Sequence, residues 1–438
     1  MAADNLHFIL ALAIFIGTYG AIVLRNIKGG SIPVWSVMLA GAVAMVFSNV
    51  ISVPEAYSSI NLEVIVFLFS MFVFVTAMDV SGLLESFTTK LFLKAKKPED
   101  IIYLTFFGFG FASSILMNDT LALMGTPIML SLAKKMKISS KPLLLTLAFS
   151  VTIGSTMTPM GNPQNLLIAL VSGIPAPVIT FILYLILPTI VNLFVTYLLL
   201  RRIYRSEFLK AREKFTELIR FEASMKDSGI EDSGFARKTL IILSLTVSGI
   251  VIINVLEAIG IKQGFGISEV SLLGATVLLL SSSKRREILK KMDWGILLMF
   301  ASLFVLMQAV WNAGIVTELS KYLPPLDKSN SMVSLISILA SSVLLSQVLS
   351  NVPMVALFLP VMKSVGYGPS NISSWVALAG GSTLAGNLTL LGAASNLIIV
   401  EEAEAKGHSL GFFEFFKIGI LVTVVNIIVL YLFLMFLP

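Results

Sequence analysis

The chain of 438 residues contains no cysteine and only two histidines, and only 13% of its residues are charged. The lack of cysteine excludes disulfides, thiolate metal sites and cysteine nucleophiles. Two histidines, His7 and His408, are too few for a histidine-rich metal site. A soluble domain carries about 25% charged residues. The scarcity of charge, together with 56% hydrophobic residues, therefore indicates a membrane protein.

Runs of apolar residues recur along most of the chain, and each is long enough to cross a bilayer as a helix. They predict spanning helices over 6–25, 32–51, 61–79, 142–171, 178–200, 237–257, 268–282, 294–312, 374–400 and 412–437. Two further apolar segments, 101–133 and 332–363, are interrupted midway by polar residues. We expect both to form re-entrant hairpins, because irregular backbone at membrane depth is tolerated only where protein or a cavity surrounds it.

The second half of the chain repeats the first. The stretch 61–84 reads NLEVIVFLFSMFVFVTAMDVSGLL and returns at 293–316, at a spacing of 232, as DWGILLMFASLFVLMQAVWNAGIV. LMNDTLALMGTPIM is matched by LSNVPMVALFLPVM at a spacing of 233, and TPMGNPQNLLI by TLLGAASNLII at 231. Internal duplication with polar breaks at matching places is typical of secondary transporters.

The basic residues predict the orientation in the membrane. With the N-terminus outside, only four of the 31 Lys and Arg residues lie outside, namely Lys262, Lys321, Lys328 and Lys363. This agrees with the positive-inside rule and places the 201–236 loop in the cytoplasm. The net charge of +6 then reflects orientation in the membrane, and no nucleic-acid partner is expected.

The same layout gives each half about five crossings, so the halves run in opposite directions. We therefore predict an all-α polytopic membrane protein with two inverted repeats of about five transmembrane helices. Each repeat contains a re-entrant hairpin and a broken helix. The first repeat covers 1–200, a charged cytoplasmic segment covers 201–236, and the second repeat covers 237–438.

Four polar breaks, at 118–120, 154–165, 350–353 and 386–396, carry the candidate binding site. Proline and glycine weaken helix interiors, and each broken helix exposes N–H groups that attract an anion and carbonyls that coordinate a small cation. A single break could be an ordinary kink, but four breaks in two related pairs favour function. The candidate substrate-binding residues are Asn118, Thr120, Thr158, Asn162, Asn165, Ser350, Asn351, Thr389, Ser395 and Asn396.

Asp119 is a candidate for coupling transport to an ion, because it is the carboxylate predicted deep in a break. Its repeat counterpart is Val352. Alternatively, Asp119 caps the second half of its hairpin, and the two roles are compatible. Gly161 and Gly392 are also assigned to the coupling-ion site, and Na⁺ is expected near Asn118, Asn165, Asn351 and Asn396. No cofactor other than H⁺ or Na⁺ is expected.

The motifs resemble a known transporter group. MNDTLALMGTPIML resembles the first-hairpin signature of the arsenical-pump membrane proteins, and SNVPMVALFLPVM with GSTLAGNLTLLGAASNLIIVEEAEAKGHSLGFFEFFKIG resembles their second-half signature. That group includes ArsB-like pumps and NhaD-type sodium/proton antiporters. It belongs to the ion transporter superfamily, with the divalent-anion/sodium symporters. The symporters carry Ser-Asn-Thr at all four breaks, whereas here only Ser350-Asn351 and Ser395-Asn396 keep the Ser-Asn pair.

The resemblance implies a homodimer in the lipid bilayer, a scaffold and a moving transport domain, and an elevator mechanism. ArsB-like pumps also associate with a separate ATPase subunit. We predict an ion-coupled secondary transporter of a small anion or an arsenite-like oxyacid in the plasma membrane. The alternative is a Na⁺/H⁺ antiporter. An enzyme is not expected, because the chain lacks HExxH, GxSxG and P-loop motifs and paired intramembrane carboxylates.

Overall fold

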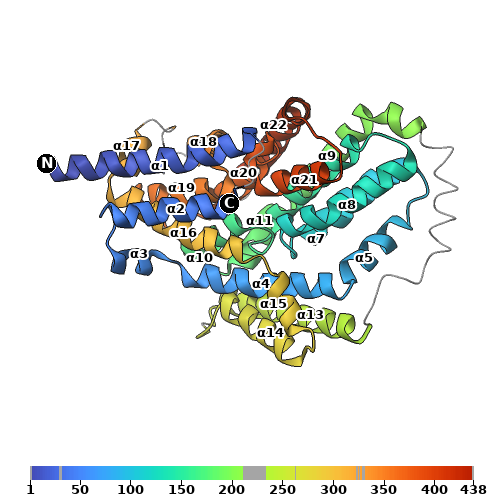
Figure 1. Ribbon diagram of the computed structural model, residues 1–438, viewed down its shortest axis with the longest axis horizontal. Coiled ribbons are helices and arrows are strands. Elements are labelled where there is room, and N and C mark those ends of the chain that lie inside the picture. The colour runs from blue at the N-terminus through green and yellow to red at the C-terminus, as the bar shows by residue number, and fades with distance from the viewer. Residues whose placement is uncertain are drawn as a thin grey trace.

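The computed structural model describes residues 2–28, 32–210, 233–261, 263–321, 324, 326–327 and 331–436. The regular elements of this part of the chain are helices (Figure 1). Most of the predicted connecting segment, residues 211–232, lies outside the described residues.

The first half contains eleven described α-helices. They are α1 (Ala2–Lys28), α2 (Val34–Phe47), α3 (Val53–Ser59), α4 (Leu62–Val80), α5 (Leu83–Phe92), α6 (Pro98–Leu104), α7 (Gly110–Ser113), α8 (Asn118–Met136), α9 (Lys141–Gly154), α10 (Pro163–Val171) and α11 (Pro177–Ile203). A π-helical turn at Thr105–Phe109 joins α6 to α7, and a 3₁₀ turn at Ser155–Met157 follows α9.

The second half contains ten described α-helices. They are α13 (Ser233–Ala258), α14 (Ile267–Ser281), α15 (Arg285–Lys291), α16 (Trp294–Asn312), α17 (Ile315–Ser320), α18 (Ser331–Leu349), α19 (Asn351–Ser364), α20 (Ile372–Ala385), α21 (Ala394–Ala405) and α22 (Phe412–Phe436). A 3₁₀ turn at Leu390–Gly392 precedes α21.

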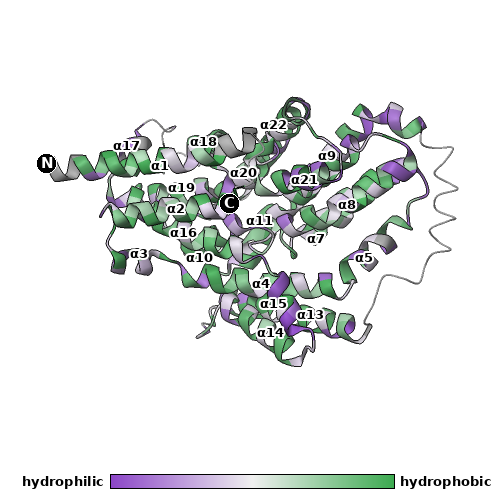
Figure 2. Ribbon diagram, viewed as in Figure 1, coloured by the Kyte–Doolittle hydropathy of each residue, from purple (hydrophilic) through white to green (hydrophobic). Residues whose placement is uncertain are grey.

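Each predicted spanning segment corresponds to helix, and the differences are in length. Helix α2 ends at Phe47 rather than 51, whereas α21 continues to Ala405 beyond the predicted 400. Six described helices are long and apolar enough to cross a membrane: α4, α11, α13, α16, α18 and α22. Figure 2 shows that hydrophobic residues cover most of these helices and that hydrophilic residues gather near α15 and at one end of α8. The helical membrane fold is therefore as predicted.

The duplication extends from the sequence to the boundaries of the helices. Helices α4 and α16 begin and end at a spacing of 232, and so do α3 and α15. Helices α9 and α20 begin and end at a spacing of 231, and α8 and α19 begin at a spacing of 233. The spacing of the motifs is thus also the spacing of the helices. The opposite orientation of the two halves, and the division at 201–236, stay predictions.

Local backbone features repeat as well. The side chain of Asn61 caps α4 by accepting a hydrogen bond from the Val64 N–H at 3.1 Å, and Asp293 caps α16 in the same way through the Ile296 N–H at 3.3 Å. Gly82 and Gly314, just after these helices, have φ values of +73° and +77°. Only glycine adopts this region freely, so the repeat keeps glycine at both turns.

Helices of one half pack against helices of the other half, and the two repeats do so in corresponding pairs. Helix α14 packs on α4, and its repeat counterpart α2 packs on α16. Helix α21 packs on α8, and its counterpart α10 packs on α19. In Figure 1, α13, α14 and α15 form a group along α4, and α8 lies beside α21. Each half therefore depends on the other half for its partners.

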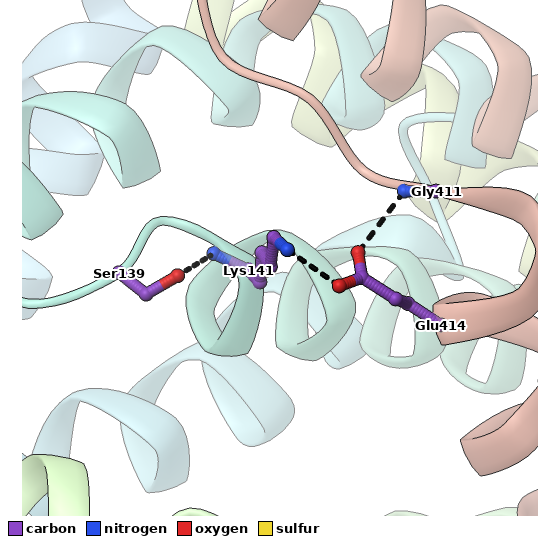
Figure 3. A network of polar contacts seen from close by, with 4 residues as sticks. All are labelled: Ser139, Lys141, Gly411 and Glu414. Atoms are coloured by element: carbon purple, nitrogen blue, oxygen red, sulfur yellow. Dashed lines mark hydrogen bonds and ion pairs between the residues drawn. The ribbon is translucent and has the colours of Figure 1, made fainter.

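A polar contact also joins the two halves at the surface (Figure 3). Lys141 Nζ lies 2.5 Å from Glu414 Oε1, and Glu414 Oε2 accepts a hydrogen bond from the Gly411 N–H at 3.2 Å. The Lys141 N–H points to Ser139 Oγ at 3.4 Å. Both charged side chains are more than 40% exposed, and exposed ion pairs stabilise proteins by only about 0–1 kcal/mol. This contact is a minor part of the interface.

Candidate functional site

The two hairpins turn immediately before the asparagines that the repeat shares. Met117 has a φ of +56°, and α8 starts at Asn118, whereas Ser350 has a φ of +66°, and α19 starts at Asn351. The first polar break was predicted at 118–120, but these residues form the first turn of α8. The first hairpin turns at 114–117 instead. Backbone N–H groups at both helix starts therefore lie at the breaks.

The first broken helix is closed by its own asparagines. Asn162 Oδ1 caps α10 by accepting a hydrogen bond from the Asn165 N–H at 2.9 Å. Asn165 Nδ2 lies 3.2 Å from the Ser155 carbonyl, 3.4 Å from that of Thr156 and 3.3 Å from that of Thr158. These carbonyls end the preceding half-helix. Asn162 Nδ2 also donates to the Ser155 carbonyl at 3.1 Å. The two side-chain amides together therefore satisfy acceptors that were expected to be free.

The second broken helix repeats this arrangement. Asn396 Nδ2 donates to the Gly386 carbonyl at 2.7 Å and to the Thr389 carbonyl at 3.2 Å. Gly386 and Thr389 are the repeat counterparts of Ser155 and Thr158, at the spacing of 231. A shared contact pattern at both breaks shows that the two asparagines have the same structural role.

Hydrogen bonds bring three of the breaks together directly. The Asn118 N–H donates to the Gly161 carbonyl at 2.9 Å, and Asn118 Nδ2 lies 3.4 Å from Ser395 Oγ. The Thr158 hydroxyl donates to the Ser114 carbonyl. The first hairpin therefore contacts both broken helices.

The second hairpin joins the same region through Gln347. Thr389 Oγ1 donates to Gln347 Oε1 at 2.8 Å, and Gln347 Nε2 donates to the Ala385 carbonyl at 3.0 Å. Gln347 is the repeat counterpart of Ser114, at the spacing of 233, so a side chain replaces the backbone carbonyl of the first repeat. A β-carbon added at Gly386 would lie 3.2 Å from Asn351 Nδ2, which places Asn351 at the second broken helix.

Sequence reasoning missed one residue that links the repeats. Thr383 on α20 accepts from Asn162 Nδ2 at 3.2 Å and from Gln164 Nε2 at 3.4 Å, and it donates to Asn165 Oδ1 at 3.1 Å. Thr383 belongs to the second repeat, but its hydroxyl hydrogen-bonds to residues at the broken helix of the first repeat. Its sequence signal is its repeat counterpart Thr152, which lies at the same position of α9.

Most of the candidate residues are buried, and two carry unpartnered atoms. The buried ones are Asn118, Thr158, Asn162, Asn165, Asn351, Thr389, Ser395 and Asn396, whereas Thr120 and Ser350 are partly exposed. Asn351 Oδ1 and Asn396 Oδ1 are buried without a hydrogen-bond partner among the described residues. Buried polar atoms in proteins are almost always paired. Asn192 Oδ1 on α11 also lacks a partner among the described residues, so it is the position of the two candidate oxygens at the breaks that makes them candidate ligand contacts.

Gly161 and Gly392 lie where two segments of the backbone pack closely against each other. A β-carbon at Gly161 would lie 2.3 Å from the Ser155 carbonyl oxygen, and one at Gly392 would lie 3.0 Å from that of Ala385. Close packing therefore accounts for both glycines, and their assignment to a coupling ion stays a prediction.

Asp119 lies in the first turn of α8 and is partly buried. Its side chain lines a cavity of about 540 Å³ between α4 and α8, together with Thr120. Its N–H lies 3.0 Å from Asn118 Oδ1. The N-cap position of α8 belongs to Met117, so Asp119 does not cap the helix in the way the alternative interpretation required.

The duplicated broken helices, buried in an apolar helical bundle, define the class of membrane transporters. The family model described as Citrate transporter matches residues 11–380, and the chain belongs to this family. The predicted resemblance to the ion transporter superfamily is thereby confirmed, as is the expectation of a transporter rather than an enzyme.

Several known proteins are similar along nearly the whole chain. The 46 kDa membrane protein of Mycobacterium leprae is 27% identical over 96% of both chains. The silicon efflux transporter LSI3 of Oryza sativa subsp. japonica is 27% identical over 83% of this chain and 84% of its own. A Dictyostelium discoideum protein named as transporter arsB is 25% identical over 89% and 85%.

Among solved structures, the fold is similar to that of the Alcanivorax borkumensis YdaH transporter. The TM-score is 0.51 with 13% sequence identity, and the match covers 84% of each chain. At this identity the likeness concerns the fold alone.

Proposed function

We propose that this protein is an ion-coupled secondary transporter of a small oxyacid or small anion of the arsenite type. The observation that carries the proposal is the pair of buried, unpartnered amide oxygens, Asn351 Oδ1 and Asn396 Oδ1, at two of the breaks. Leaving a buried oxygen without a hydrogen-bond partner destabilises the folded protein by about 1–3 kcal/mol. A bound solute with hydroxyl groups, or a small cation, would remove this penalty.

The chemistry of the breaks favours a small solute. The side-chain amides and hydroxyls at the breaks both donate and accept hydrogen bonds. The helix N-termini at Asn118 and Asn351 present N–H groups, which donate. The candidate residues include no arginine or lysine, which a multivalent anion would normally recruit. The rice relative is named for silicon efflux, and silicon dissolves in water at neutral pH as an uncharged oxyacid, silicic acid. We therefore favour a small oxyacid over citrate, although the family model is described by the latter.

Coupling to an ion completes the proposal. Asp119 is the candidate for exchanging H⁺ or Na⁺, because an ionisable group at a helix break within the membrane is functional by default. Na⁺ is proposed near Asn351 and Asn396. A homodimer with an elevator motion, placed in the plasma membrane with 201–236 in the cytoplasm, remains part of the proposal, and a separate ATPase is not required.

The test is transport by the purified protein in proteoliposomes. Arsenite, silicic acid and citrate are offered in turn under imposed H⁺ or Na⁺ gradients. Asn351→Ala and Asn396→Ala should each lower oxyacid uptake at least about tenfold. The matched control is Asn192→Ala on α11, because Asn192 is equally buried and its Oδ1 also lacks a partner among the described residues, but it lies outside the four breaks. Its amide donates to the Asn426 carbonyl at 3.2 Å. Unchanged uptake by both break variants would contradict the proposal.

A Na⁺/H⁺ antiporter is the second candidate. The cavity that Asp119 lines also contains Asp79, Asp293 and Glu402, and such a cavity suits a cation. Na⁺/H⁺ exchange at full rate with no other solute present would support the antiporter and reject the oxyacid transporter.

A further inference from the structure

Two cavities in the structure are related by the repeat. One, the α4–α8 cavity, has a volume of about 540 Å³, and the other, the α16–α19 cavity, has about 270 Å³. Many of their lining residues correspond at spacings of 231 to 233, as in Phe72 and Phe304, Thr76 and Gln308, and Pro127 and Pro360. The corresponding walls indicate that both cavities derive from the same part of the repeat. The α4–α8 cavity has the larger volume.

The two cavities differ in charge. Asp79, Glu85, Asp119, Asp293 and Glu402 line the α4–α8 cavity with a single cation, Lys291. The counterparts of four of these carboxylates are Trp311, Val352, Asn61 and Val171. Among the residues that the structure describes, the lining of the α16–α19 cavity contains no charged side chain. The duplication therefore preserved several wall positions of the cavity but neither its volume nor its charge.

The α4–α8 cavity reaches the first break, at 118–120. Asp119 and Thr120 line it, and they follow Asn118, which contacts Ser395 and Gly161 at the two broken helices. Elsewhere in the lining of this cavity, Asp79 lies near the end of α4 and Asp293 at the start of α16, and both are exposed. A solute that reaches the breaks through this cavity must pass between carboxylates.

Clefts lined by one sign of charge, with walls of low dielectric constant, change the local concentration of ions by roughly 10- to 1,000-fold. Four of the five carboxylates, with Asp119 at the break left out, still exceed the one lysine, whose ammonium group is also 3.1 Å from Glu287. The cavity therefore has a negative potential. Cations gather in it, anions are depleted, and uncharged solutes are unaffected.

We propose that the α4–α8 cavity is an entrance to the four breaks that admits uncharged and cationic solutes and excludes anions. This rests on the proposed function and narrows it, because the transported solute must pass this entrance as the neutral oxyacid. The coupling cation enters by the same route. The α16–α19 cavity, whose lining has no charged side chain among the described residues, should not discriminate between cations and anions.

The absence of cysteine makes the entrance directly testable. Thr76→Cys places one thiol in the α4–α8 cavity, and Gln308→Cys places one at the matched position of the α16–α19 cavity. The purified protein in detergent, with both faces accessible, is treated with trimethylammonium-ethyl or sulfonatoethyl methanethiosulfonate. The cation-to-anion ratio of the reaction rates is divided by the ratio for a free thiol.

We expect a corrected ratio of at least about 10 at Thr76→Cys and near 1 at Gln308→Cys. Adding Asp79→Asn and Glu402→Gln should lower the first ratio several-fold. The control neutralises two glutamates that do not line this cavity, Glu63→Gln and Glu257→Gln, and should leave the ratio unchanged. High salt should lower the ratio as well, because it screens the carboxylates.

A corrected ratio near 1 at Thr76→Cys, no reaction there with either reagent, or no effect of the two cavity neutralisations would overturn the inference. Labelling does not require transport. A ratio of 10 in a protein that moves no oxyacid would therefore leave the entrance in place and reject only the proposed function.

Discussion

Replacing Thr383 by valine tests whether the second repeat stabilises the break of the first. Valine has nearly the shape of threonine, so the change removes the hydroxyl with little change in packing. Thr383 is fully buried and supplies the only hydrogen bond that the described residues give to Gln164 Nε2 and to Asn165 Oδ1. It also accepts one of the bonds of Asn162 Nδ2.

The expected loss of stability follows from these three contacts. Interhelical hydrogen bonds in membrane proteins contribute roughly 0.6 kcal/mol each, so three amount to about 2 kcal/mol. If no water reaches the two buried groups that lose their partners, each instead costs about 1–3 kcal/mol, or about 2–6 kcal/mol together. We therefore expect Thr383→Val to destabilise the protein by about 2–6 kcal/mol. With an unfolding entropy of about 2 cal/mol/K per residue, the melting temperature should fall by about 2–7 °C.

The repeat supplies the matched control. Thr152 is the counterpart of Thr383 on α9 and is also fully buried, but its hydroxyl has no hydrogen-bond partner among the described residues. Thr152→Val should therefore leave the melting temperature unchanged or raise it. Melting is followed by intrinsic fluorescence in detergent, with Thr383→Ser expected to keep most of the stability. Equal losses for the two valine variants would refute the reasoning.

Three further predictions follow from the same geometry. Asp119→Asn should abolish gradient-driven uptake while thermal-shift binding of the solute survives, and an unchanged dependence of uptake on pH and Na⁺ would remove Asp119 from coupling. Gly154→Ala should reduce the yield of folded protein and lower its melting temperature by several degrees, because the new β-carbon would lie 1.9 Å from the Gly110 carbonyl oxygen; a normal melting curve would contradict the close helix contact. A cysteine replacing Lys137 should resist an impermeant external reagent in intact cells, and its labelling would reverse the predicted orientation.

The sequence alone determined the helices and the duplication. Apolar runs and Gly-Pro breaks act locally, so the ranges of α4 and α16 were predicted to within one residue. Asn162, which the sequence placed within a predicted break, is the N-cap of α10. The asparagines of the breaks were found because the repeat places them at equal spacings. These features depend on neighbours in the chain, and a single sequence contains that information.

Only the tertiary structure decided which groups satisfy one another. Thr383 is 218 residues from Asn165, and Asn118 is 277 residues from Ser395. No local pattern shows that the oxygen of Asn165 is paired whereas that of its counterpart Asn396 is not. The same holds for the carboxylates of the α4–α8 cavity, which come from separate helices. Their negative potential exists only because packing places them around one space, and that packing depends on the whole chain.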